Sequence, residues 1–172
     1  MIKKAEFIEK LNRIDANSFE LELFSKFLNC HAKLNVFSGD STKDSVVISD
    51  YLMSCVEDFI NFDNSEIDEI QDQIYKDYKI AIKVTEYGII PERLYEKNNN
   101  VIENVNQEYF DINNKKEAFE SLSFTYASVV EYLTKGKIEE GSRYVGFFFE
   151  RPWDVEHELQ IVLENGKFKQ IL

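Results

Sequence analysis

Residues 144–172 of the chain read YVGFFFERPWDVEHELQIVLENGKFKQIL. The run at 144–149 is aromatic and β-branched, a composition typical of a buried or half-buried strand. Gly146 would weaken a plain strand and indicates a bulge or a close backbone neighbour. Pro152 has no N–H to donate and restricts Arg151 to extended conformations, so strand pairing should end at this point.

A second strand is predicted at 157–164, where apolar and polar residues alternate. The alternation places His157, Leu159, Ile161 and Leu163 on one face. We expect this face to point toward the core.

The turn that follows is the clearest hairpin signal in the chain. Asn165 and Gly166 suit a type I′ turn, which needs positive φ at both positions. The returning strand is predicted at 167–172. A two-residue loop would place Glu164 opposite Lys167, a favourable pair of opposite charges.

The corner between the two strands, residues 151–157, resembles a family signature. Trp153-Asp154-x-Glu156-His157, followed by an alternating strand and an Asn-Gly turn, is similar to the W-D-x-E-H-G-L pattern of a group of small uncharacterised bacterial proteins. The matching residues are Trp153, Asp154, Glu156, His157, Leu159, Asn165, Gly166 and Lys167. Glu158 stands where that family usually has glycine.

The resemblance covers roughly a fifth of the chain. It implies a domain of unknown function with an α/β two-layer arrangement. Some members of the group resemble immunity proteins of toxin systems. No established activity comes with it.

The corner has a structural and a catalytic interpretation. In the structural one, Trp153 anchors the corner and His157 donates a ring N–H to Asp154 or Glu156. In the alternative, the chain is an enzyme or metal-dependent hydrolase that uses the Trp153–His157 corner. Alternation along a strand would turn His157 away from Glu156 and Glu158, so these groups would not converge on a metal. We favour the structural role, and expect no metal, cofactor or catalytic residue.

A nucleophilic active site would need Ser, Cys or Thr beside a base. The chain has two His, His31 and His157, and two Cys, Cys30 and Cys55. Cys30 and His31 are neighbours and would point to opposite faces of an extended chain, which leaves Cys55 as a partner across space. A family-type nucleophile motif is absent. We therefore expect two buried thiols and no disulfide.

Composition predicts one acidic globular domain spanning residues 1–172. Fourteen Phe and nine Tyr provide large side chains for a core. The net charge of −12 would repel nucleic acid and anionic membranes and is compatible with a basic protein partner. No membrane-spanning run and no signal peptide are visible, so we expect a cytoplasmic protein.

Much of the negative charge lies in one window. Between Asp44 and Tyr75 the chain has nine acidic residues and no Lys or Arg. The window has two interpretations, a solvated face that keeps the protein soluble or a docking surface for a basic partner. The candidate docking residues are Glu57, Asp58, Asp63, Glu66, Asp68, Glu69 and Asp72.

The rest of the chain mixes strands and helices. Periodicity predicts helices at 2–12, from 49 or 50 to 60, and from Ser65 to about 82, and strands at 19–23 and 34–37. Residues 83–113 have no clear pattern beyond a brief strand at 101–105. A last helix is predicted from Asn114, with an apolar stripe of Phe119, Leu122, Tyr126, Val129, Val130 and Leu133 and with Gly136 as its C′ residue.

These elements predict an α+β fold, a two-layer sandwich of an antiparallel sheet with helices packed on one face. Three functional hypotheses remain. The favoured one is a non-catalytic cytosolic protein-binding module, such as an immunity protein that neutralises a basic toxin domain. The second is an enzyme that uses the corner, and the third is a homodimer assembled through an exposed aromatic strand face.

Overall fold

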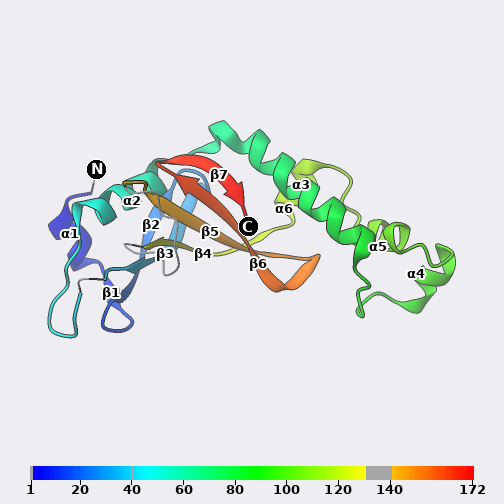
Figure 1. The fold of residues 1–172 in the computed structure, drawn as a ribbon, viewed down its shortest axis with the longest axis horizontal. Helices are drawn as coiled ribbons and strands as arrows, with labels where there is room; N and C mark the ends of the chain where they lie inside the picture. The colour runs from blue at the N-terminus through cyan, green and yellow to red at the C-terminus, as the bar shows by residue number, and fades with distance from the viewer. Residues whose placement is uncertain (1, 40, 131–140) are drawn as a thin grey trace.

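The computed structural model describes residues 2–39, 41–130 and 141–172 (Figure 1). The strands are β1 (Asn12–Arg13), β2 (Ser18–Ser25), β3 (Cys30–Phe37), β4 (Ser123–Val130), β5 (Tyr144–Arg151), β6 (Asp154–Glu164) and β7 (Lys167–Ile171). The helices are α1 (Lys4–Glu9), α2 (Asp50–Asn61), the 3-10 turn η1 (Asn64–Glu66), α3 (Ile67–Val84), α4 (Glu92–Lys97), α5 (Ile102–Phe110) and α6 (Lys115–Glu120). The expected α+β class is confirmed.

The seven strands lie in one sheet in their order along the chain. Neighbouring strands are antiparallel except β3 and β4, which are parallel, with Leu34 opposite Ala127. A parallel pair needs a long crossover, and here it contains α2 to α6. The sheet is therefore mostly antiparallel, and most of the helical layer is the connection between β3 and β4.

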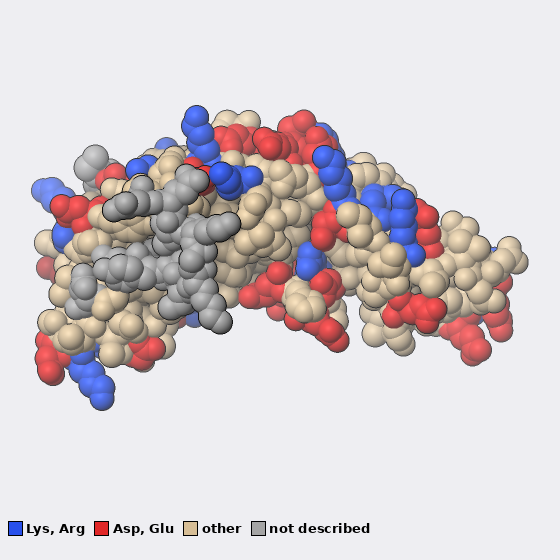
Figure 2. Space-filling model, viewed as in Figure 1, with Lys and Arg blue, Asp and Glu red and all other residues tan. Residues whose placement is uncertain are grey.

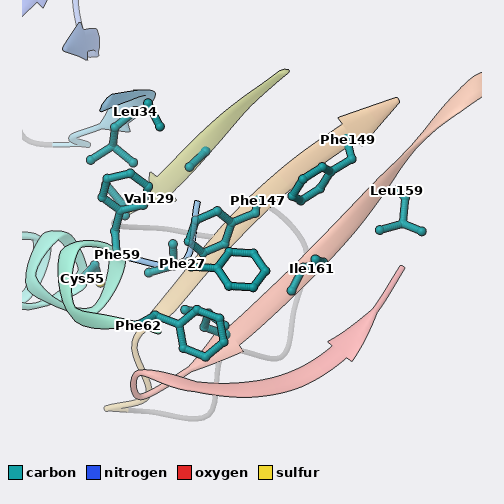
Figure 3. Close-up of a cluster of buried hydrophobic side chains, with 14 of the residues drawn as sticks. Phe27, Leu34, Cys55, Phe59, Phe62, Val129, Phe147, Phe149, Leu159 and Ile161 are labelled. Atoms are coloured by element: carbon teal, nitrogen blue, oxygen red, sulfur yellow. The ribbon is translucent and has the colours of Figure 1, made fainter. Parts of the chain in front are cut away.

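One face of the sheet carries the core. Every second residue of the central strands points into it, and Leu34, Val129, Phe147 and Ile161 are completely buried. Figure 3 shows aromatic rings from α2 and the segments around it packed on these strands. Phe59 stacks on Phe147 with ring centroids 5.5 Å apart. Burial of such large apolar groups stabilises the fold by about 1.5–3 kcal/mol for each side chain.

The opposite face carries polar and aromatic side chains that are exposed or half-buried. Phe24 and Phe37 are 44% and 40% exposed there. Lys33 forms an ion pair with Glu20 at 2.6 Å on the same face. An exposed strand face with aromatic side chains is the kind of surface that the homodimer hypothesis requires.

The start of α2 is as predicted and the start of α3 is not. Ser49 caps α2, because its Oγ accepts a hydrogen bond from Leu52 N at 3.1 Å. The predicted capping box at Ser65 is wrong. Asp63 instead accepts a hydrogen bond from Ser65 N at 2.9 Å and begins η1, after which α3 starts at Ile67.

Residues 83–113, which have no clear hydrophobic pattern in the sequence, contain the helices α4 and α5 and continue from the end of α3. Figure 1 shows α4 and α5 beyond the sheet, and we call residues 85–112 the helical arm. The predicted strand at 101–105 is wrong because Val105 and Asn106 belong to α5 and are fully buried. Asn106 Nδ2 donates to Ile82 O at 2.7 Å and to Thr85 O at 2.8 Å, so α5 satisfies carbonyls at the end of α3.

The predicted last helix is wrong over most of its length. Asn114 does cap a helix, with its side chain accepting from Glu117 N at 3.1 Å, but α6 ends at Glu120. Ser123–Val130 is strand β4. The expected end of that helix, including Leu133 and Gly136, lies outside the described residues.

The C-terminal hairpin is confirmed. Asn165 and Gly166 have φ of 53° and 76°, and Glu164 lies opposite Lys167. The bulge or close backbone neighbour predicted at Gly146 is wrong, because Gly146 pairs regularly with Val162 and its close neighbour is the side chain of Gln160, whose Nε2 occupies the space that a Cβ would need. β6 begins at Asp154, earlier than predicted.

The outer edge of β7 faces α3. Phe168 N donates to Glu66 Oε2 at 2.6 Å, and Ile171 N donates to Gln73 Oε1 at 3.2 Å. Side chains of η1 and α3 therefore occupy N–H groups that a further strand would otherwise use.

The expectation that both cysteine thiols are buried holds for one cysteine and is wrong for the other. Cys55 is buried as expected, and burial raises the pKa of its thiol to about 11. Cys30 is exposed, since it lies at the first position of β3, on the turn from β2. Both are free thiols. Among the described residues, no helix combines the length and apolar character needed to cross a membrane.

Candidate functional site

Trp153 anchors the tip of the β5–β6 hairpin, by which we mean residues 150–158, to α3. This side chain is 1% exposed and lies against Tyr78 of α3, with ring centroids 5.2 Å apart. Its Nε1 donates to Asp77 Oδ2 at 3.0 Å, so its one polar atom is satisfied inside the packing. The structural role expected for Trp153, an anchor for the corner, agrees with this geometry.

Arg151 joins the hairpin to α3 by two ion pairs. Its Nη1 contacts Asp77 Oδ2 at 2.8 Å, and its Nη2 contacts Asp154 Oδ2 at 2.8 Å. The arginine side chain is only 11% exposed, so solvent screens these pairs less than pairs at the surface. The guanidinium therefore fixes both strand ends against the helix.

His157 contacts the same network but not the core. Its Nδ1 lies 3.1 Å from Asp154 Oδ1, one of the two carboxylate partners predicted for it. The prediction that it points into the core is wrong, because its side chain is 71% exposed. Burial raises the pKa of Asp154, but the hydrogen bond with His157 and the charge of Arg151 outweigh burial and leave that pKa below its ordinary value.

Tyr87 connects the helical arm to the hairpin tip. Its hydroxyl donates to Trp153 O at 2.7 Å, and its ring meets Phe110 of α5 edge to face at 5.0 Å. Sequence reasoning missed both Tyr87 and Asp77 as members of this corner. They lie 66 and 76 positions before Trp153, and no local pattern connects them to it.

Three of the hollows formed by the described residues adjoin the hairpin tip. The first, which we call the apolar hollow, has a volume of about 720 Å³ and is lined mainly by apolar and aromatic side chains from three segments of the chain. Exposed side chains contribute to it, with Val155 85% exposed, Ile89 63% and Tyr109 37%. Pro152, in the turn between β5 and β6, forms part of the wall of this hollow.

The second hollow, about 470 Å³, is lined mainly by polar side chains, and we call it the acidic hollow. Four carboxylates and one guanidinium line it, those of Glu150, Asp154, Glu156, Glu158 and Arg151. Figure 2 shows acidic side chains gathered at the hairpin tip and the outline indented between the tip and the helical arm. The charge of this hollow favours a cation.

The third hollow, about 430 Å³, lies between the hairpin tip and the end of α3. Asp77, Ala81 and Trp153 contribute to its wall, as does the segment 85–89. The family-signature residues Trp153, Asp154, Glu156 and His157 all line it. The structure thus brings the four predicted corner residues together at the wall of this third hollow, next to the ion pairs of Arg151.

The acidic window is less concentrated than its sequence suggests, because most of its carboxylates contact groups within the chain. Asp58 binds Arg143, Asp63 caps η1, Glu66 accepts from Phe168 N, and Asp68 and Asp72 bind Lys115. Glu57 and Glu69 complete the predicted set, on α2 and on the first turn of α3. Neutralisation by Lys and Arg weakens the field of this window.

The chemistry of the corner is limited by what surrounds His157. An imidazole held by a carboxylate is an arrangement that suits general acid–base catalysis. Within the described residues, no hydroxyl or thiol is hydrogen-bonded to His157, and no group of three or more His, Cys, Asp or Glu is arranged to hold a metal ion.

Comparison with known proteins gives one family. The family described as a domain of unknown function, DUF6985, matches residues 10–171. No curated protein matches the chain, and no solved structure does. Since the family match covers nearly the whole chain, the protein belongs to the DUF6985 family.

Proposed function

We propose that this protein is a non-catalytic protein-binding module and that the tip of the β5–β6 hairpin is its binding surface. The observation that carries the proposal is the apolar hollow, where exposed Ile89, Tyr109 and Val155 meet from three separate segments. Exposed apolar side chains that gather at one hollow mark interaction sites more often than single exposed ones do. The network of Arg151 holds the surface in place without a partner, which lowers the entropic cost of binding.

The partner in this proposal is a basic protein. The chain has a net charge of −12, and four carboxylates line the acidic hollow beside the apolar one. Opposite charge on a partner would accelerate association and select against acidic competitors. The most concrete form of the proposal is an immunity protein that neutralises a basic toxin domain, as the resemblance of the Trp153–His157 signature implies.

The test is co-expression with the protein encoded by the neighbouring gene. We expect a complex that elutes as one species at low salt and dissociates on addition of about 0.5 M NaCl, because screening shortens the range of charge–charge attraction. If the neighbouring protein is basic and no complex forms at low salt, the proposal is wrong.

An enzyme is the second candidate, and the contact between Asp154 and His157 favours it. In that case His157→Ala would abolish a measurable activity while the unfolding transition stayed within about 0.5 kcal/mol of wild type, the usual range for exposed positions. A change in stability alone, with every activity assay unaffected, would remove this candidate.

A further inference from the structure

We propose that the hairpin tip recognises a short peptide segment that presents an apolar and a basic side chain on the same side. The apolar side chain would enter the apolar hollow and the basic one the acidic hollow. This inference rests on the proposed protein-binding function and adds the chemistry of the segment that binds.

The two hollows are neighbours with different walls. Ser121, Pro152 and Val155 line both of them. Beyond these shared residues, the apolar hollow continues along Ile89 and Tyr109, whereas the acidic hollow continues along carboxylates. Val155, 85% exposed, therefore stands at the boundary between an apolar and a charged compartment.

The acidic hollow is selective for positive charge. Glu150, Glu156 and Glu158 are exposed, so a ligand can reach their carboxylates from solvent. Glu158 already accepts hydrogen bonds from the hydroxyls of Thr125 and Tyr126, but these donors are neutral and leave its negative charge in place. Arg151 lines the hollow as well, but both ends of its guanidinium fork are bound to Asp77 and Asp154. The remaining carboxylates favour a guanidinium or ammonium group over a neutral or acidic one.

The apolar hollow supplies the other half of the recognition. Apolar contact with Ile89, Tyr109 and Val155 would remove these exposed side chains from water, which is favourable by about 25 cal/mol for each Å² buried. In an extended peptide, side chains at positions i and i+2 point to the same side, about 6–7 Å apart. Two such side chains could enter the hollows on either side of Val155.

The experiment uses the full chain labelled with ¹⁵N and three capped peptides. Acetyl-Leu-Gly-Arg-amide is the probe, and acetyl-Leu-Gly-Glu-amide and acetyl-Gly-Gly-Arg-amide test each half of it. We expect the probe to shift the amide resonances of Ile89, 150–151 and 153–158 in a saturable way. Each altered peptide should bind at least about fivefold more weakly, as expected for the loss of about 1 kcal/mol.

Matched variants test the two hollows separately. Val155→Ser should weaken binding of the probe by about fivefold, and Glu156→Gln by about threefold, the usual range for one exposed carboxylate. Ile14→Ser likewise replaces an exposed β-branched apolar side chain by serine, next to β1, and Glu9→Gln removes an exposed carboxylate in α1. Both should leave the affinity unchanged. Equal losses in the control variants, or equal binding of the Glu peptide, would overturn the inference.

The outcome separates this inference from the proposed function. If the neighbouring protein binds wild type and the Val155→Ser, Glu156→Gln double variant equally well, protein binding stands and the hairpin tip is wrong as its site. If neither the neighbouring protein nor the probe binds, the proposed function itself fails.

Discussion

Arg151 is the residue on which the hairpin tip depends most. It is 11% exposed and paired with Asp77 and Asp154, whose side chains are about a third exposed, at 33% and 29%. Removal of one partner from a largely buried ion pair leaves the other charge poorly solvated. The remaining exposure of the two carboxylates reduces that cost but does not cancel it.

We predict that Arg151→Met lowers the free energy of unfolding by about 2–3 kcal/mol, at the low end of the range for buried pairs because of this exposure. Lys33→Met is the control, since it removes a cation from the exposed pair with Glu20 and should cost less than about 1 kcal/mol. Urea unfolding of the two variants gives the comparison. Equal losses would mean that the network of Arg151 adds nothing beyond a surface pair.

Asp154 makes the stability of this network depend on pH. The pKa of Asp154 lies below its ordinary value in the folded protein, despite burial, because of its contacts with His157 and Arg151. A lowered pKa contributes stability above the unfolded pKa, about 3.9, and that stability is lost as pH falls through the folded pKa. We predict that wild type loses more stability than Asp154→Asn between pH ~5 and ~3. Parallel curves of unfolding free energy against pH would contradict this.

At the scale of elements, the C-terminal hairpin depends on its turn. Gly166 has a φ of +76°, and a Cβ there would lie 2.9 Å from Oδ1 of Asp58, the carboxylate that binds Arg143. The residue therefore meets a conformational requirement of the turn and a steric one, and the steric requirement connects the turn to α2.

We predict that Gly166→Ala lowers the free energy of unfolding by about 1–2 kcal/mol because of the left-handed backbone. Gly88→Ala is the matched control, since a Cβ there meets nothing within 4 Å. It should leave stability unchanged or raise it by up to about 1 kcal/mol through the unfolded chain. Thermal unfolding of both variants decides the point, and a smaller loss at Gly166 than at Gly88 would refute it.

Elements with local causes were predictable from the sequence, and those that depend on distant partners were not. The turn at Asn165-Gly166 and the cap at Ser49 are local and correct. The segment Ser123–Val130 fits a helical stripe as well as a strand, and its pairing with β3, whose residues lie 93 positions earlier (Leu34 opposite Ala127), decides for the strand. Tertiary context overrode a pattern that was compatible with both.

At the scale of the whole molecule, the proposed binding surface is assembled from segments far apart in the chain. Ile89 and Tyr109 both come from the helical arm, Tyr109 within α5, and Val155 comes from the hairpin. The sequence signature singled out Trp153–His157, and these residues lie at the hairpin tip that contributes Val155 to the hollow. It could not indicate the other walls, because Asp77 and Tyr87 reach the corner only through the folded position of α3 and the arm.

The hydrogen bond from Tyr87 to Trp153 O, at 2.7 Å, is a direct connection between the arm and the hairpin. Tyr87→Phe removes it but keeps a ring that can meet Phe110, so we expect a loss of about 1 kcal/mol in stability, as for one hydrogen bond. Tyr75→Phe is the control, because its hydroxyl also donates to a backbone carbonyl, that of Asn113 at 3.1 Å.

Both variants should have similar free energies of unfolding, but only Tyr87→Phe should increase the mobility of Ile89, which lines the apolar hollow. We predict faster amide hydrogen exchange at Ile89 and Ile90 and weaker binding of acetyl-Leu-Gly-Arg-amide in Tyr87→Phe alone. Without the hydrogen bond of Tyr87, Ile89 would become ordered only when the peptide binds. The conformational entropy lost in that ordering would then weaken the affinity. Equal exchange and equal affinity in the two variants would show that the arm is held in place without Tyr87.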